Sequence, residues 1–134
     1  MLRRIMIEIL PDADTIEKLA ERAFATIPED LRKQVDGVAI RVVDLPDERT
    51  CAEMELESPY DLLGLYHGIP LDAQSVLNVK QDVDMIFLYR LPLLAYAEDT
   101  GEDLFDVVKN VLIHEIGHHF GFSDEEMEAI EESD

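Results

Sequence analysis

Residues near the end of the chain have the types and spacing of a metal site. The segment from His114 to Asp124 has the pattern H-E-x-x-H-x-x-G-x-x-D. Each residue of a helix advances about 100°, so His114 and His118 lie one turn apart and both imidazoles can reach the same ion. Glu115 lies beside their face, where its carboxylate can contact a water molecule at the ion. The pattern therefore predicts a metal centre that activates water.

A third ligand is expected after the helix ends. Gly121 can adopt a left-handed conformation that turns the chain back, which would bring Asp124 toward the two histidines. Two histidines and one carboxylate leave one position of a zinc ion open for water. We favour Asp124 because a helix cap at Ser123 leaves the Asp124 side chain free. If Asp124 is itself the cap, the alternatives lie on the next turn: Glu125, Glu126 and Glu128.

The distribution of histidines favours this interpretation over that of an ordinary polar helix end. The chain has four histidines, and three of them lie between positions 114 and 119. His119 points about 100° away from His118 on a helix. We therefore interpret His119 as a packed residue or as one that contacts a metal ligand, and not as a ligand itself.

Three blocks of sequence resemble those of a known family, in the same order and spacing. They are G-L-Y-H-G-I-P-L at residues 64–71, I-F-L-Y-R at 86–90 and the segment 111–124. The motif resembles that of the zincin superfamily, with an aspartate as third ligand as in snapalysin-like metzincins. Over about residues 14–127, the chain resembles the small prokaryotic zincin-like metallopeptidases known as minimal zincins. This resemblance implies a zincin-like fold and peptidase activity.

These residues predict a zinc-dependent metallopeptidase that hydrolyses a peptide or protein substrate. Zn²⁺ held by His114, His118 and Asp124 would lower the pKa of its bound water toward neutrality. Glu115 would take the proton as water attacks a peptide carbonyl and then give it to the leaving amine.

Two alternatives belong to other classes of protein. The first is a zinc-binding regulatory or interaction module with little or no peptidase activity. Glu115 argues against it, because zinc binding alone does not require that residue. The second is an interaction protein in which the motif is fortuitous, and stoichiometric zinc in the purified protein would exclude it.

Length and charge limit the partners of the protein. A chain of 134 residues is expected to form a single domain over residues 1–134. With 31 acidic and 11 basic residues, its net charge is −20. This charge disfavours nucleic acid and anionic membranes and favours a basic peptide, although solubility explains it equally well.

The cellular compartment is predicted from the single cysteine and the lack of a long apolar segment. Cys51 has no partner for an internal disulfide, which fits a reducing compartment. No stretch of sequence reaches transmembrane length. We expect a cytoplasmic monomer.

Hydrophobic periodicity predicts an α+β fold, in which a small mixed sheet packs on helices around a central zinc-binding helix. That helix is expected at about residues 101–120, capped by Thr100. The polar residues 44–59 predict a surface loop. The other elements are expected as strands at residues 4–10, 38–43, 61–66 and 85–89 and as helices at residues 15–27, 29–34, 92–97 and 124–132.

Two further predictions concern substrate binding. Residues 85–89 are apolar on both faces, which fits either a core strand or a sheet edge over the cleft to which an extended peptide could add. A donor to the oxyanion is also expected. Tyr66, His67 and Tyr89 are candidates, although each fits better as a core aromatic or a turn residue.

Overall fold

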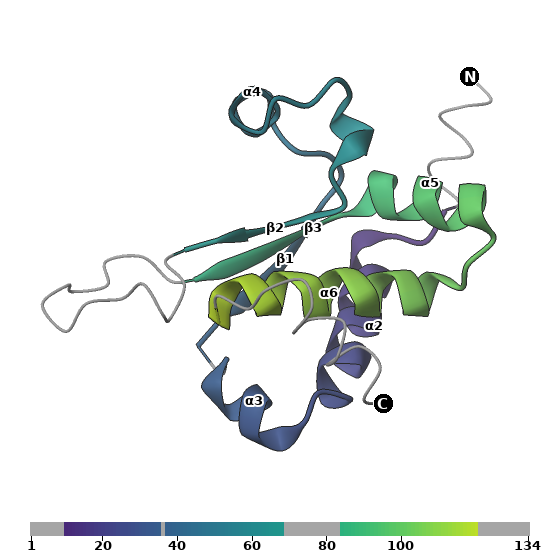
Figure 1. Ribbon diagram of the computed structural model, residues 1–134. Coiled ribbons are helices and arrows are strands. Elements are labelled where there is room, and N and C mark those ends of the chain that lie inside the picture. The colour runs from purple at the N-terminus through teal and green to yellow at the C-terminus, as the bar shows by residue number, and fades with distance from the viewer. Residues whose placement is uncertain (1–9, 36, 69–83, 121–134) are drawn as a thin grey trace, which may run out of the picture.

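A three-stranded sheet forms one layer of the protein (Figure 1). Its strands are β1 (Ala39–Val43), β2 (Gly64–His67) and β3 (Met85–Tyr89), in the order β1-β3-β2. β3 pairs in parallel with β1 and in antiparallel orientation with β2. The sheet is therefore mixed, and the α+β prediction is confirmed. The computed structural model describes residues 10–35, 37–68 and 84–120.

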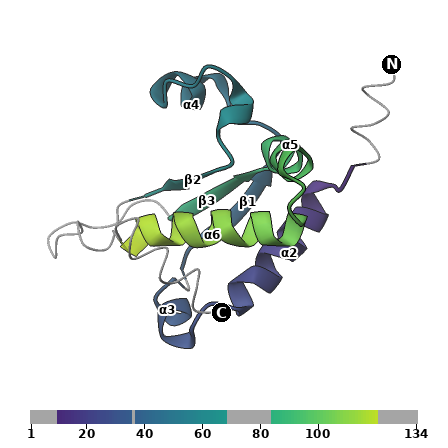
Figure 2. The same cartoon turned by 45° about the vertical axis from the view of Figure 1, so that its right-hand side comes forward.

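Helices α2 and α6 form the second layer, below the sheet in the view of Figure 2. The buried core lies between α2, α6 and β3, and includes Ile16, Leu88 and Leu112. Alternate β3 residues Ile86 and Leu88 are buried, because successive strand residues face opposite sides. The helices are α2 (Ala13–Ala25), α3 (Glu29–Gln34), α4 (Glu48–Glu53), the 3₁₀ turn η1 (Pro59–Asp61), α5 (Arg90–Thr100) and α6 (Leu104–Phe120).

β3 is the central strand of the described sheet, so of the two alternatives for residues 85–89 the structure shows the core strand and not the sheet edge. A neighbouring strand pairs with β3 on each side. Ile86 and Leu88 are buried on one face of β3, and on its other face the rings of Phe87 and Tyr89 stack on each other. A strand covered on both faces needs no polar alternation, which is why its sequence fits a central position.

Two other predicted boundaries differ from the structure. The interval 44–59 contains a helix, α4, because the Asp47 side chain caps it by accepting a hydrogen bond from the Thr50 N–H at 2.7 Å. Thr100 ends α5 instead of capping α6, and its hydroxyl donates to the Tyr96 carbonyl at 2.8 Å. Gly101 then reverses the chain with φ of 74°, a conformation that favours glycine.

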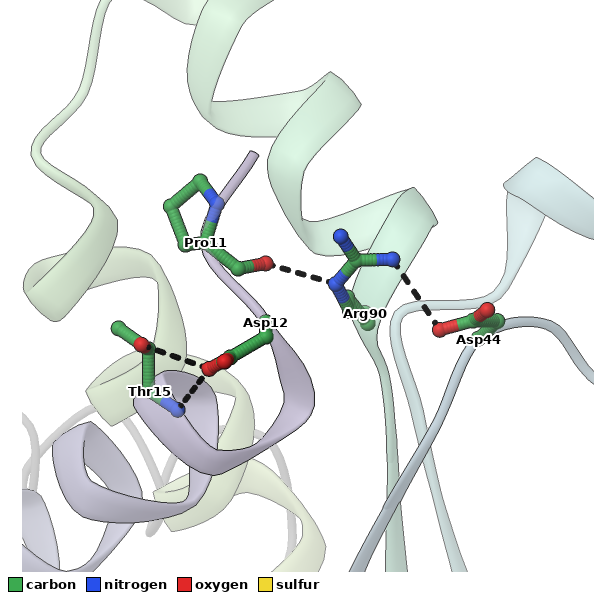
Figure 3. A network of polar contacts seen from close by, with 5 residues as sticks. All are labelled: Pro11, Asp12, Thr15, Asp44 and Arg90. Carbon is green, nitrogen blue, oxygen red and sulfur yellow. Dashed lines mark hydrogen bonds and ion pairs between the residues drawn. The ribbon is translucent and has the colours of Figure 1, made fainter. Parts of the chain in front are cut away.

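Arg90 joins three segments at the end of β3, where α5 begins (Figure 3). Its Nε donates to the Pro11 carbonyl at 2.7 Å, and its Nη1 lies 3.2 Å from Asp44 Oδ1. The Arg90 side chain is buried, and a charged donor strengthens such hydrogen bonds. Arg90 therefore fixes the start of α2 and the end of β1 at the point where β3 turns into α5.

Some predictions lie outside the described residues. These are the strand at residues 4–10, the connection at 71–83 and the helix at 124–132. Among the helices that the structure describes, none is long and apolar enough to cross a membrane.

Candidate functional site

Helix α6 places His114 and His118 next to each other, as their spacing predicts. The centres of their rings are 5.0 Å apart, with 62° between the ring planes. The His118 side chain is 46% exposed. Leu112 and Ile116, on another face of the same helix, are buried in the core. The two imidazoles therefore lie at the boundary between the core and solvent.

Glu115 lies between these histidines and the sheet, and only 6% of it is exposed. Its Oε1 accepts a hydrogen bond from the backbone N–H of Tyr66 at 2.9 Å and lies 3.3 Å from Nδ1 of His118. Burial raises the pKa of Glu115, while His118, the Tyr66 N–H and His114 oppose that rise. The result is a buried carboxyl group poised to hold or release a proton.

The close approach of β2 to α6 depends on Gly64. A Cβ at this position would lie 2.7 Å from Val111 Cγ1 and 3.1 Å from the Phe87 carbonyl oxygen. Because glycine has no side chain, the backbone of β2 can pack directly against α6. This packing brings the Tyr66 N–H within reach of Glu115.

β2 is an edge strand in the described sheet, and some of its main-chain groups point away from β3. The Tyr89 N–H donates to the Leu63 carbonyl at 3.0 Å, so alternate residues from Leu63 onward face β3. Gly64 and Tyr66 therefore direct their N–H and C=O groups outward. The outward N–H of Tyr66 is the group that binds Glu115.

A groove of about 450 Å³ contains the three motif residues His114, Glu115 and His118. Its other walls come from the end of α4, the segment before β2, α5 and the start of α6. Most of the lining side chains are apolar, among them Met54, Leu62, Leu63, Tyr96, Val107 and Val111. Sequence analysis did not find these residues, because they come from four separate segments.

The three candidates for oxyanion stabilisation do not line this groove. The Tyr66 hydroxyl hydrogen-bonds to the buried Asp84, and burial is the main cause that raises the pKa of Tyr66 to about 12. The Tyr89 ring is buried, while His67 is exposed at the end of β2. Sequence analysis missed the contribution of Tyr66 through its backbone, for which side-chain type gives no signal.

The predicted third ligand, Asp124, lies outside the described residues, as do Glu125, Glu126 and Glu128. Within the described ranges, no group of three or more His, Cys, Asp or Glu residues is arranged to hold a metal ion. The structure thus brings together His114, His118 and Glu115 and leaves the third ligand as a prediction.

A comparison of the sequence with protein families agrees with this geometry. Residues 35–133 match the model of a family described as zincin-like metallopeptidase. This match covers most of the chain, including β1, β2, β3 and α6. No curated protein matches the chain as a relative. The chain belongs to the zincin-like metallopeptidase family.

Proposed function

We propose that this protein is a zinc-dependent metallopeptidase. The observation that carries the proposal is the buried carboxyl of Glu115, held by the Tyr66 N–H beside two histidines at the wall of a groove. A site that only binds metal does not need this carboxyl group. A hydrolase does, because general-base assistance contributes roughly 100- to 10,000-fold in rate.

The histidine pair fits zinc. His114 and His118 would hold the zinc, because imidazole is a common zinc ligand and the centres of the two rings are 5.0 Å apart. Asp124 would complete the protein ligands. Bound zinc would supply a Lewis acid that polarises the peptide carbonyl and increases the acidity of water.

The residues of the chain would then move the proton and hold the substrate. Glu115 accepts a proton from the attacking water and returns it to the leaving amine. The Tyr66 N–H fixes one oxygen of the Glu115 carboxylate. An extended peptide can add to the outward groups of β2 other than the Tyr66 N–H, antiparallel to the strand because that pairing is slightly more stable. This proposal replaces β3 by β2 as the strand that binds substrate.

Metal analysis tests the zinc site. Protein purified without a His-tag should contain one zinc per chain, and His114→Ala and His118→Ala should abolish it. Asp124→Ala should weaken zinc binding much more than Glu126→Ala or Glu128→Ala. Stoichiometric zinc in the double histidine variant would refute the site, and the reverse ranking of the carboxylates would move the third ligand.

Hydrolysis of casein or of a peptide library tests the activity. Glu115→Gln should fold, keep near-normal zinc and lose at least about 100-fold in rate. Glu17→Gln is the matched control, because Glu17 is exposed on α2, outside the groove, and the variant should retain full activity. If the wild-type protein cleaves no more than Glu115→Gln at equal zinc loading, a zinc-binding regulatory module replaces the peptidase.

A further inference from the structure

We propose that Asp84, the residue immediately before β3, is a positioning residue that acts on Glu115 through Tyr66. Asp84 holds the side chain of Tyr66, and the main chain of Tyr66 holds the carboxylate of Glu115. The expected effect on hydrolysis rests on the proposed peptidase function. The expected effect on the hydrogen bond between Tyr66 and Glu115 does not, because it is measured in the metal-free protein.

Asp84 is a buried residue that does not line the groove. Only 1% of it is exposed, and its backbone carbonyl accepts a hydrogen bond from the Ala39 N–H at 3.0 Å. The main chain of Asp84 is therefore tied to β1. A buried carboxyl group is costly unless it is hydrogen-bonded, so its side chain holds its hydrogen-bond partners in place.

The Tyr66 hydroxyl is one partner of the Asp84 side chain. Tyr66 lies opposite Ile86 in the register of β2 and β3, and Asp84 is two residues before Ile86. Asp84 is thus the diagonal neighbour of Tyr66, a position that an aromatic side chain can reach. The main-chain N–H and C=O of Tyr66 point away from β3, so the diagonal contact links Tyr66 to β3 where the ladder of main-chain hydrogen bonds does not.

Gly68, just after β2, leaves the space in which this hydroxyl and this carboxyl group meet. A Cβ at position 68 would overlap Asp84 Oδ1 and lie 2.8 Å from the Tyr66 hydroxyl oxygen. Any larger residue would push the two groups apart, as expected where glycine permits a close approach. The contact between Asp84 and Tyr66 therefore requires glycine at this position.

The main chain of Tyr66 reaches the proposed general base. Its N–H donates to Glu115 Oε1 at 2.9 Å, and the same oxygen lies 3.3 Å from His118 Nδ1. Hydrogen bonds weaken steeply when the donor is misaligned, so a shift of the Tyr66 main chain would let the carboxylate rotate toward His118. Loss of the Asp84 contact would permit such a shift, and the orientation of a catalytic group strongly affects the rate.

Amide hydrogen exchange, measured by NMR in the metal-free protein, tests the positioning. Tyr66→Phe keeps the ring and removes only the hydroxyl, so exchange of the residue-66 amide should become about tenfold faster or more. The Leu65 amide faces β3, because Leu65 lies opposite Phe87 in the ladder, and its exchange should change little. Tyr60→Phe is the matched control, since Tyr60 is exposed on η1, and both amides should keep their wild-type rates.

Two Asp84 variants separate the acceptor from the rest of the side chain. Asp84→Ala removes the acceptor and should speed exchange at residue 66 as Tyr66→Phe does. Asp84→Asn keeps an oxygen that can accept from the Tyr66 hydroxyl and should restore most of the protection. Combining Asp84→Ala with Tyr66→Phe should add little to either change, because both break the same hydrogen bond.

Gly68→Ala separates Asp84 and Tyr66 while retaining both. Its control is Gly101→Ala, because both glycines have a positive φ, 155° and 74°, but no atom lies within 4 Å of a Cβ at Gly101. Exchange at residue 66 should become faster only in Gly68→Ala.

Two results of the exchange measurement would overturn the proposal. One is unchanged exchange at residue 66 in Tyr66→Phe, whether or not Asp84→Ala folds. The other is an equal increase at residues 65 and 66, because β2 as a whole would then have loosened.

Hydrolysis tests the consequence for the proposed general base. At equal zinc loading and saturating substrate, Tyr66→Phe should lower kcat about ten- to a hundredfold, and the same change should cost little in the Glu115→Gln background. An unchanged kcat, or an equal loss in both backgrounds, would overturn the proposal, because Tyr66 would then not act through Glu115. Selective exchange without hydrolysis by the wild-type protein would refute only the peptidase function.

Discussion

The backbone N–H of Tyr66 donates to Oε1 of Glu115 at 2.9 Å, although the two residues are 49 positions apart in the chain. This hydrogen bond connects the edge strand β2 to the helix that carries His114 and His118. The strand proposed to bind the substrate therefore also orients the proposed general base. A displacement of β2 would affect both the binding of a peptide and the position of the Glu115 carboxylate.

Gly64→Ala tests how closely β2 must approach α6. The added Cβ would lie 2.7 Å from Val111 Cγ1, so β2 or Val111 must move. We expect a loss of about 1–3 kcal/mol in the free energy of unfolding, as for other overpacked sites. The rate of hydrolysis should fall by more than the loss of folded protein explains. Urea unfolding and peptidase assays measure the two effects.

The control for this variant is Gly37→Ala. No atom lies within 4 Å of a Cβ at Gly37, so the stability should change little or increase slightly. Equal stability of Gly64→Ala and Gly37→Ala would show that the contact with Val111 does not position β2.

Glu115→Gln should stabilise the metal-free protein at pH 7. Burial raises the pKa of Glu115 above its ordinary value of 4.5, so the folded state holds its proton more tightly than the unfolded state. Stability contributed by the neutral carboxyl is present below about pH 4.5 and is lost as pH rises through the raised pKa. Glutamine is neutral at every pH and avoids this loss.

Thermal unfolding in the presence of a chelator measures this effect. The melting temperature of Glu115→Gln should exceed that of the wild type at pH 7, and the difference should shrink toward pH 4. A lower melting temperature of the variant at pH 7 would mean that the charged carboxylate stabilises the metal-free fold. Zinc content is checked first, because bound zinc changes the comparison.

The protein should lose stability between pH 10 and 12. Burial is the largest cause that raises the pKa values of Tyr66 and Tyr89 from 10.0 to about 12. In this interval the unfolded chain loses the phenolic protons while the folded chain keeps them, so stability falls as pH rises. Tyr66→Phe should reduce the slope of melting temperature against pH, whereas the exposed-site variant Tyr60→Phe should retain it.

Arg90→Met should destabilise the fold without altering the site directly. The change removes the hydrogen bond to the Pro11 carbonyl and the ion pair with Asp44 (Figure 3). Hydrogen bonds from a buried charged group contribute about 1.5–3 kcal/mol, and we expect a loss of that size in urea unfolding. Arg41→Met, at an exposed position of β1, should change stability by less than about 0.5 kcal/mol.

The sequence alone determined the features that depend on local geometry. Helical spacing predicted that His114 and His118 lie side by side with Glu115 next to them, because the angle per residue of a helix is constant. The predicted ranges of α3, β1 and β3 agree with the structure to within one residue, because short apolar or capped segments carry their own signals.

Tertiary structure decided which strand lies at the edge and what surrounds Glu115. The apolar sequence of β3 fits a central strand and an edge strand equally well until its two neighbours are known. The groove brings together Met54, Tyr96 and Val111 from distant segments, and the Tyr66 N–H is a group that every residue except proline possesses. Contacts of this kind depend on the packing of β2 against α6, which no local pattern of residues specifies.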